Sequence, residues 1–344
     1  MVRKIGFIGF ANYSGLGNQS KRLYELLFPY RTLIINSNGF SKNKGLDTSW
    51  CKDAFITKDG FPMDEEIDSF LQGLTHVLYL ENAYNHYLTY KARQLGIKTY
   101  CQVNYEFCEN VGKRYLPEPD MFLMPSHWMA SEMQEIFGRD RVIYLPPPLD
   151  REEFKAVREH NFMRLGKKRF LHIIGTLAYK DRNGTLDLIE AVKKSQSDFE
   201  LVIRTQHQIT MDYYLDDPRV TYVNDSVSDV SEMYKDFDAL ILPRKYGGLS
   251  LTTNEALMSG LPVIMTDVSP NNKWLPKSWL VESNHNNRIM IKAPLDVYRV
   301  DSEALKNKID EFCSMDLLEE KKKAIELAYN EFCNLEDKYL SLFQ

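Results

Sequence analysis

The sequence predicts an α/β protein of two similar domains, each built on a parallel β-sheet with helices between its strands. Short apolar segments alternate with amphipathic helical segments almost throughout the 344 residues, which is typical of parallel sheets. That length is too great for one ordinary core and suits two domains of roughly 150 residues each. Three consecutive prolines (Pro146, Pro147 and Pro148) donate no backbone hydrogen bonds, so they predict a stiff connection between the domains.

The first domain is expected to span residues 1–147. A helix over residues 18–28 follows its first strand and ends before Pro29, which cannot continue it. Residues 37–59 are polar and weakly patterned, and we expect a mobile loop near the ligand edge of the sheet. The predicted strands lie near residues 5–10, 32–36, 76–80, 98–103, 121–124 and 142–145.

The second domain is expected to span residues 148–315, with helices over 185–195 and 252–258, the latter ended by Gly260. Residues 316–344 are charged and helical in pattern, and we expect them to form a helix that returns to the first domain. The predicted strands of this domain lie near residues 170–174, 200–204, 220–223, 239–242, 263–266 and 280–282.

Composition excludes several classes of protein. The net charge of −5 provides no global basic field for nonspecific nucleic-acid binding. Five scattered cysteines without CxxC spacing indicate neither a disulfide framework nor a zinc site. The N-terminus enters a strand pattern at once, and no run approaches the ~18 apolar residues of a membrane span. We therefore expect a cytoplasmic protein, without stable membrane insertion or a bound metal.

Residues 241–262 form the most informative segment of the chain. They read as a buried strand, a turn at Gly247 and Gly248, and a helix with Glu255 in its first turns. Such a turn lets the backbone approach a ligand closely, and a helix start offers unpaired N–H groups to phosphate. Glu255 could take sugar or ribose hydroxyls, although it could instead only interact with the helix dipole.

Residues that follow the strands of an open α/β sheet lie at its ligand edge. Cations gathered there would neutralise a diphosphate, which carries roughly two charges, and arginine can grip its oxygens in bidentate fashion. A solvated loop is the alternative for Lys180 and Arg182. The candidates in the second half are Thr176, Lys180, Arg182, Arg204, Asn224 and Arg244.

The first half offers a glycine-rich connection between its first strand and first helix, with Gly15 and Gly17 as candidate ligand contacts. A turn with a helix cap would explain the same glycines. Glu106 follows the fourth strand and could reach a ligand. The histidines His76, His86, His127 and His172 are weaker candidates, because a lone histidine is more often structural. No HExxH, GxSxG or P-loop pattern is present.

Over nearly its whole length the chain resembles the retaining GT-B glycosyltransferases of the large GT4 family. The segments that carry the likeness are SGLGNQSKRL, YLPPPLD, HIIGTLAYKDRNGTLDLIEA and PRKYGGLSLTTNEALMSGLPVIMTD. The resemblance implies two Rossmann-like domains that face each other across a cleft, with the C-terminal helix crossing back to the first. It also implies that the second domain binds a nucleotide-diphosphate sugar and the first the acceptor.

In that family the last segment carries two glutamates eight positions apart, of which the second contacts the donor ribose and the first the transferred sugar. Glu255 matches the second, whereas the first falls on Gly247. The sugar contact would then come from Arg244, Tyr246 or the backbone N–H groups of Gly248 and Leu249, with Ser250 also in the donor site. The family's arginine after the first strand of this domain is Thr176 here, so the charge would come from Lys180, Arg182 or Arg204.

The resemblance therefore implies transfer of a sugar, first of all from a UDP-sugar, to a saccharide or glycoconjugate hydroxyl with retention of configuration. Arg244, Gly248 and Glu106 are the expected catalytic residues, with no cofactor and a monomeric or homodimeric protein. A bacteriophage-type transfer to hydroxymethylated bases of DNA is the first alternative, with phosphate contacts from residues 164–169, Lys21, Arg22, Lys42 and Lys44. A nucleotide-sugar 2-epimerase using Glu81 and Glu106 and a noncatalytic nucleotide-sugar binding protein are the others.

Overall fold

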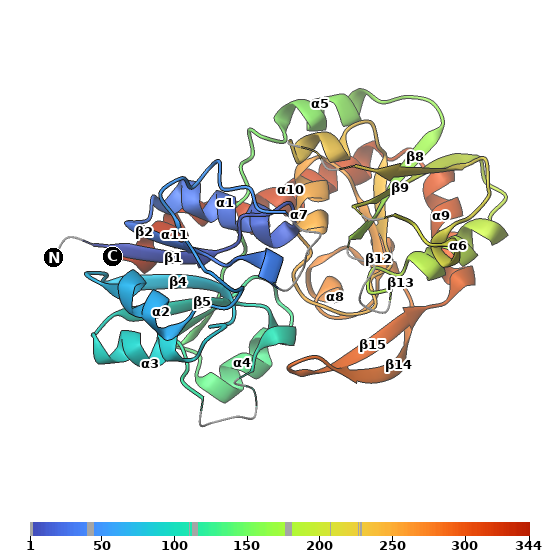
Figure 1. Cartoon of the computed structure of the whole chain (residues 1–344). Coiled ribbons are helices and arrows are strands. Elements are labelled where there is room, and N and C mark those ends of the chain that lie inside the picture. The colour runs from blue at the N-terminus through green and yellow to red at the C-terminus, as the bar shows by residue number, and fades with distance from the viewer. Residues whose placement is uncertain are drawn as a thin grey trace. The chain divides into compact units, whose positions relative to one another are not determined.

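The computed structural model describes residues 3–39, 45–109, 111, 116–175, 181–206, 208–225, 227 and 229–344 (Figure 1). The chain divides into two compact units. The first unit contains Met1–Leu149, Ile291–Ala293 and Asn334–Gln344. The second unit contains Asp150–Met290 and Pro294–Cys333.

The first unit is built on a seven-stranded parallel sheet of order β3-β2-β1-β4-β5-β6-β7. Its strands are β1 Ile5–Gly9, β2 Arg31–Ile34, β3 Phe55–Ile56, β4 His76–Glu81, β5 Lys98–Val103, β6 Met121–Met124 and β7 Val142–Tyr144. Its helices are α1 Gly15–Leu27, η1 Ser37–Gly39, α2 Asp64–Leu71, α3 Tyr87–Gln94, η2 Tyr105–Phe107, α4 Ala130–Phe137 and α11 Leu335–Leu342.

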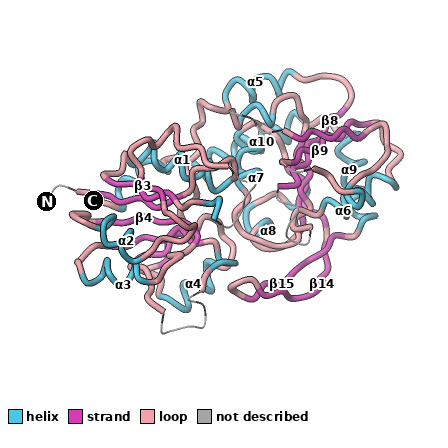
Figure 2. Tube along the Cα trace, in the orientation of Figure 1, coloured by secondary structure: helices cyan, strands magenta, loops and turns pink. Residues whose placement is uncertain are grey.

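The second unit has a six-stranded parallel sheet of order β10-β9-β8-β11-β12-β13 and a separate antiparallel hairpin, β14–β15 (Figure 2). Its strands are β8 Lys168–Gly175, β9 Phe199–Thr205, β10 Val220–Asn224, β11 Ala239–Leu242, β12 Val263–Thr266, β13 Leu280–Val281, β14 Ser283–Met290 and β15 Pro294–Val300. Its helices are α5 Lys155–Met163, α6 Thr185–Lys194, η3 Met211–Tyr213, η4 Ser231–Tyr234, α7 Leu251–Met258, α8 Asn271–Trp274, η5 Lys277–Trp279, α9 Ser302–Ser314 and α10 Leu318–Phe332.

The predicted fold class is confirmed, because both units are α/β structures on parallel sheets. Strands β11 and β12 are buried at every residue, as expected of parallel strands covered on both faces. Each predicted strand is present within two residues of its expected limits. None of the described helices is long and apolar enough to cross a membrane.

Each sheet has one point at which the strand order reverses. Strand β1 pairs with both β2 and β4, and β8 pairs with both β9 and β11. Ligands of open parallel sheets bind beyond the carboxyl ends of the strands at such a reversal. The sheet order therefore directs attention to the loops after β1 and β4 in the first unit and after β8 and β11 in the second.

The sequence did not predict strands β3, β14 and β15. Five consecutive residues of β14 are exposed, so this strand lacks the alternation of apolar and polar residues that marks a half-buried strand. Strand β3 lies inside residues 37–59, where we expected a mobile loop. Within that segment Cys51 is 1% exposed and packs with Ala11 and Ile34, whereas residues 40–44 lie outside the described residues.

The proline run is buried in the first unit and lies just before the division between the units, which falls after Leu149. The C-terminal tail differs from the single returning helix that we expected. Helix α10 lies in the second unit, where it packs against α7, and only α11 returns to the first. There the Tyr339 hydroxyl donates to the Pro146 carbonyl at 3.0 Å, and Tyr100 donates to the carbonyl of Leu342 at 2.9 Å.

Candidate functional site

The loops that follow β8 and β11 form one wall at the reversal of the second sheet. The Lys245 N–H donates to the carbonyl of Arg182 at 2.8 Å. Gly184, immediately before α6, has a φ of +71°, and a Cβ there would lie 2.9 Å from the Pro243 carbonyl carbon. Only glycine allows this approach, because both the backbone conformation and the space exclude a side chain.

Asp181 occupies the N-terminus of α6. Its carboxylate accepts hydrogen bonds from the N–H groups of Thr185 at 2.8 Å and Leu186 at 3.2 Å. Lys245 lies 2.8 Å from the same carboxylate and 3.3 Å from that of Asp187, and all three side chains are at most 12% exposed. The positive end of α6 therefore already holds an anion that belongs to the protein.

The N-terminus of α7 is open. The Ser250 hydroxyl accepts from the Thr253 N–H at 3.3 Å and caps the helix. The N–H groups of Leu251 and Thr252 have no partner among the residues that the structure describes. Free amides and the helix dipole together make such an end suitable for an anion.

Two guanidinium groups lie beside the turn that leads into α7. Arg244 is 8% exposed, and its Nη1 donates to the Leu249 carbonyl at 2.7 Å. The Arg182 guanidinium lies 5.3 Å from the centre of the Tyr246 ring, which is 3% exposed. Both cations are thus fixed by this turn, where they would add charge to the anion site of α7.

The Arg182 guanidinium also covers Gly247. This glycine has a φ of +102°, and a Cβ there would lie 2.8 Å from both Cζ and Nε of Arg182. A residue with a side chain would be strained at this φ and would displace the guanidinium. The space beside Gly247 is therefore occupied by a cation from another loop.

Glu255 is the fifth residue of α7 and is 3% exposed. The hydroxyl of Tyr234, which is fully buried in η4, donates to Glu255 Oε2 at 2.7 Å. This bond fixes the orientation of the carboxylate. The sequence could not reveal Tyr234 as its partner, because the two residues are 21 positions apart.

Two further donor-site candidates, Arg204 and Asn224, are not brought to this turn. Arg204 is paired with Asp225 at 2.5 Å, and it ends β9, while Asn224 ends the edge strand β10. Both strands lie on the far side of β8 from β11. Thr176 and Lys180 lie outside the described residues.

Gly15, Gly17 and Glu106 belong to the first unit. Ser14 caps α1 by accepting from the Gly17 N–H at 3.3 Å. A Cβ on Gly17 would lie 2.8 Å from the Asn12 carbonyl carbon, so packing alone requires a glycine there. Glu106 is 3% exposed, and its carbonyl accepts from the N–H of Lys292 at 3.0 Å.

His172 has a structural role. Its Nδ1 lies 2.8 Å from the Ile241 carbonyl and its Nε2 lies 2.8 Å from the Thr185 hydroxyl. Burial lowers the pKa of His172, so the ring is held neutral. It links β11 to the start of α6.

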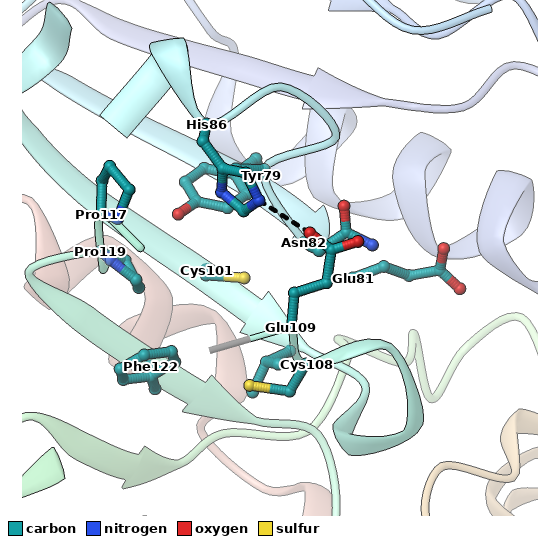
Figure 3. Close-up of a pocket in the computed structure, with 12 residues that line it drawn as sticks. Tyr79, Glu81, Asn82, His86, Cys101, Cys108, Glu109, Pro117, Pro119 and Phe122 are labelled. Atoms are coloured by element: carbon teal, nitrogen blue, oxygen red, sulfur yellow. Dashed lines mark hydrogen bonds and ion pairs between the residues drawn. The ribbon is translucent and has the colours of Figure 1, made fainter. Parts of the chain in front are cut away.

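Sequence reasoning missed a pocket near the carboxyl ends of β4 and β5. Its cavity volume is only about 20 Å³, and its walls include Tyr79, Cys101 and Phe122 (Figure 3). His86 lies 2.7 Å from Glu109 at its polar side, as the dashed line in Figure 3 shows. Burial strongly raises the pKa of Cys101, so this thiol is held neutral.

Three basic residues of the segment 164–169 form ion pairs within the second unit. Arg164 pairs with Asp236 at 3.2 Å and also with Asp238. Lys167 pairs with Asp198 at 2.5 Å. Arg169 pairs with Glu200 at 3.3 Å and with Asp236. Lys42 and Lys44 lie outside the described residues.

Part of the second unit matches a known protein family. Residues 168–310, which contain the wall and α7, match the model of the family described as glycosyl transferases group 1. No curated protein sequence matches the chain.

Solved structures match the chain over nearly its whole length at low sequence identity. A glycosyltransferase from Rickettsia africae is similar with a TM-score of 0.67 and 15% identity, over 99% of this chain and 97% of that one. Sucrose-phosphate synthase from Thermosynechococcus elongatus is similar with a TM-score of 0.63 and 14% identity, over 100% and 95%. Anabaena HepE in complex with UDP-glucose has a TM-score of 0.64 and 10% identity, over 98% and 95%.

The fold is GT-B. The two parallel-sheet units correspond to the two α/β domains of that fold. In this GT-B chain the matched family segment contains Asp181, Arg182, the Gly247 turn and Glu255.

Proposed function

We propose that the protein is a retaining glycosyltransferase of the GT4 family that transfers a sugar from a UDP-sugar to a saccharide or glycoconjugate hydroxyl. The observation that carries this proposal is the open N-terminus of α7 beside Arg244 at the strand reversal of the second sheet. The match to glycosyl transferases group 1 over residues 168–310 supports it. So do similar structures that contain UDP and glucose, or UDP-glucose, in Anabaena HepE.

The diphosphate would lie at the N-terminus of α7. Negative charge grows on this group as the bond to the sugar breaks, and fixed dipoles and cations stabilise that charge without reorganising. The Leu251 and Thr252 N–H groups would donate to the phosphate oxygens, with Arg244 and Arg182 beside them. These groups need no metal ion to do this.

Glu255 would bind the ribose hydroxyls of the donor. Its carboxylate accepts hydrogen bonds strongly, and the bond from Tyr234 holds it in one orientation. The reaction would follow a front-face course in which the leaving phosphate receives the proton of the acceptor hydroxyl. Gly247 and Gly248 would let the backbone approach the transferred sugar.

Binding and turnover of UDP-sugars test the proposal. We expect UDP to bind in calorimetry, UDP release from at least one UDP-sugar when saccharide acceptors are added, and retained configuration in the NMR spectrum of the product. Glu255→Ala should weaken UDP binding by about tenfold or more, because a charged hydrogen-bond acceptor is lost. Absence of UDP binding, or UDP binding that Glu255→Ala leaves unchanged, would refute the proposal.

The same assays separate the other candidate functions. A new sugar-nucleotide isomer formed without acceptor would identify an epimerase. Tight UDP-sugar binding with no transfer to any acceptor would identify a binding protein. The ion-paired residues 164–169 give no support to the DNA-modifying alternative, because a phosphate backbone needs cations that are available to it.

A further inference from the structure

A buried asparagine of α5 joins η4 to the end of α7. Asn161 is 0% exposed, and its Nδ2 donates to the carbonyl of Tyr234 at 2.9 Å and to that of Ser259 at 3.0 Å. Its Oδ1 accepts from the N–H groups of Asp236 at 2.8 Å and Phe237 at 3.3 Å. The side-chain amide therefore uses both of its donor hydrogens and both of its acceptor lone pairs inside the second unit.

Tyr234 and Ser259 in turn hold Glu255 at two points. The Tyr234 hydroxyl donates to Glu255 Oε2 at 2.7 Å. The N–H and the hydroxyl of Ser259 both donate to the Glu255 carbonyl, at 2.9 Å and 2.8 Å. The carboxylate and the backbone of Glu255 are thus bound from two different segments, and Asn161 binds both segments.

A buried ion pair fixes Asn161 itself. The Asn161 carbonyl accepts from Lys321 Nζ at 2.7 Å, and Lys321 pairs with Asp238 at 2.9 Å. Both charged side chains are at most 5% exposed. Lys321 lies in α10, which packs against α7 (Figure 1). Because buried polar groups are costly unless they are bonded, this network holds one arrangement of α5, η4 and α7.

Such a network suits a carboxylate that binds its ligand in one orientation. A carboxylate has about four acceptor sites, so the bond from Tyr234 is compatible with bonds from ligand hydroxyls. An acceptor that is already oriented needs no further ordering when the ligand binds. The two neighbouring hydroxyls of ribose can both donate to one carboxylate, whereas 2′-deoxyribose has only one of them. A site built for a hydroxyl rejects the analogue that lacks it.

We propose that Tyr234, anchored by Asn161, is a positioning residue that holds Glu255 so that the site selects a ribonucleotide donor over a 2′-deoxyribonucleotide donor. This inference rests on the proposed function, in which Glu255 binds the ribose of the donor. It adds the selectivity for the sugar of the nucleotide and the residue that sets it.

Calorimetry with UDP and 2′-deoxy-UDP tests the inference on the full chain. We expect the wild-type protein to bind UDP about tenfold more tightly than 2′-deoxy-UDP, because the deoxynucleotide lacks a hydroxyl that donates to a charged group. Tyr234→Phe removes only a hydroxyl from a fully buried ring. This variant should bind UDP about fivefold more weakly, and its preference for UDP should fall to about threefold or less.

The double variant that combines Tyr234→Phe with Glu255→Ala distinguishes positioning from a role in stability alone. A positioning residue acts through Glu255. Once residue 255 is alanine, Tyr234→Phe should therefore change UDP affinity by less than about twofold. A residue that only stabilises the fold would have the same effect on UDP affinity with and without Glu255.

Tyr339→Phe is the matched control. Tyr339 is also 0% exposed, and its hydroxyl donates to the Pro146 carbonyl at 3.0 Å in the first unit. The variant loses a buried hydrogen bond of the same kind as Tyr234→Phe does. It should lower the midpoint of urea unfolding, yet bind UDP and 2′-deoxy-UDP as the wild-type protein does.

Binding of UDP to the wild-type protein separates this inference from the proposed function. If UDP does not bind, the proposed function fails and the inference fails with it. If Glu255→Ala weakens UDP binding but Tyr234→Phe changes neither affinity nor preference, the inference is wrong and the proposed function stands. Equal wild-type affinities for UDP and 2′-deoxy-UDP, additive effects in the double variant, or a lost preference in Tyr339→Phe would also overturn the inference.

Discussion

Helices α6 and α7 begin after the neighbouring strands β8 and β11, so both direct a partial positive charge towards the same edge of one sheet. In α6 the first amides bind the carboxylate of Asp181. In α7 the Ser250 hydroxyl takes the Thr253 N–H, and the two amides before it stay available among the described residues. Direction and position are therefore insufficient to make a helix end a ligand site. Whether a helix N-terminus can bind a ligand depends on whether side chains of the protein already occupy its N–H groups.

Among the variants at these two helix ends, Asp181→Ala should lower the free energy of unfolding most. It removes the cap of α6 and leaves Lys245 with Asp187 as its remaining ion-pair partner among the described residues, in a largely buried setting. Breaking such a pair costs about 3 kcal/mol of the free energy of unfolding. Urea unfolding measures the change. Asp181→Asn, which keeps an acceptor for the helix amides, should lose less, and equal losses in the two variants would show that the cap contributes nothing.

Gly247→Ala should weaken UDP binding by displacing Arg182, and Gly166 provides a matched control. Gly166 has a φ of +98° and nothing within 4 Å of its Cβ position, whereas Gly247 has a φ of +102° and the Arg182 guanidinium against it. Backbone strain should cost each alanine variant about 1–2 kcal/mol of stability. Only Gly247→Ala should lower the affinity for UDP in calorimetry. If the Gly247→Ala and Gly166→Ala variants bind UDP equally well, Arg182 does not contribute to UDP binding.

Ser250→Ala should cost about 1 kcal/mol, the usual contribution of a helix cap. The loss is smaller than for Asp181 because Ser250 is uncharged and only partly buried. Thermal unfolding with and without UDP checks this prediction. UDP should offset part of the loss, since a bound anion also stabilises the N-terminus of α7. If Ser250→Ala lost as much stability as Asp181→Ala, the proposed difference between the two helix N-termini would be wrong.

His172 should give the smallest effect, through pH. Burial lowers its pKa below the ordinary value of 6.5, so below about pH 6.5 the unfolded chain takes up a proton that the folded protein resists. The free energy of unfolding should therefore fall between pH 7 and pH 5. His172→Gln should show a shallower fall in urea unfolding at the two pH values, and an unchanged slope would show that other groups control it.

The strands were the most predictable part of the fold. Residues 98–103, 121–124, 239–242 and 263–266 form strands with the expected limits. The last three are largely apolar runs that end at turn signals. The turn at Gly247 and the helix that carries Glu255 were predictable for the same reason.

The contacts that distinguish α6 from α7 were not predictable in the same way. Asp181 four positions before Thr185 is a recognisable capping signal, but its partner Lys245 lies 64 residues further along. The pairing of Arg204 with Asp225 depends equally on the fold. Glu81, the last residue of β4, has a left-handed φ of +64°, which the sequence does not signal because glutamate has no preference for it.

The contact between Arg182 and Gly247 has a consequence for how this protein can change. A glutamate at position 247 needs Arg182 to leave, and a smaller residue at position 182 leaves a glycine turn with no charge above it. Either substitution alone should impair the protein. The two together would relieve the clash with the guanidinium, while the φ of +102° would still strain a side chain at position 247. The effects of substitutions at positions 182 and 247 should therefore depend on each other.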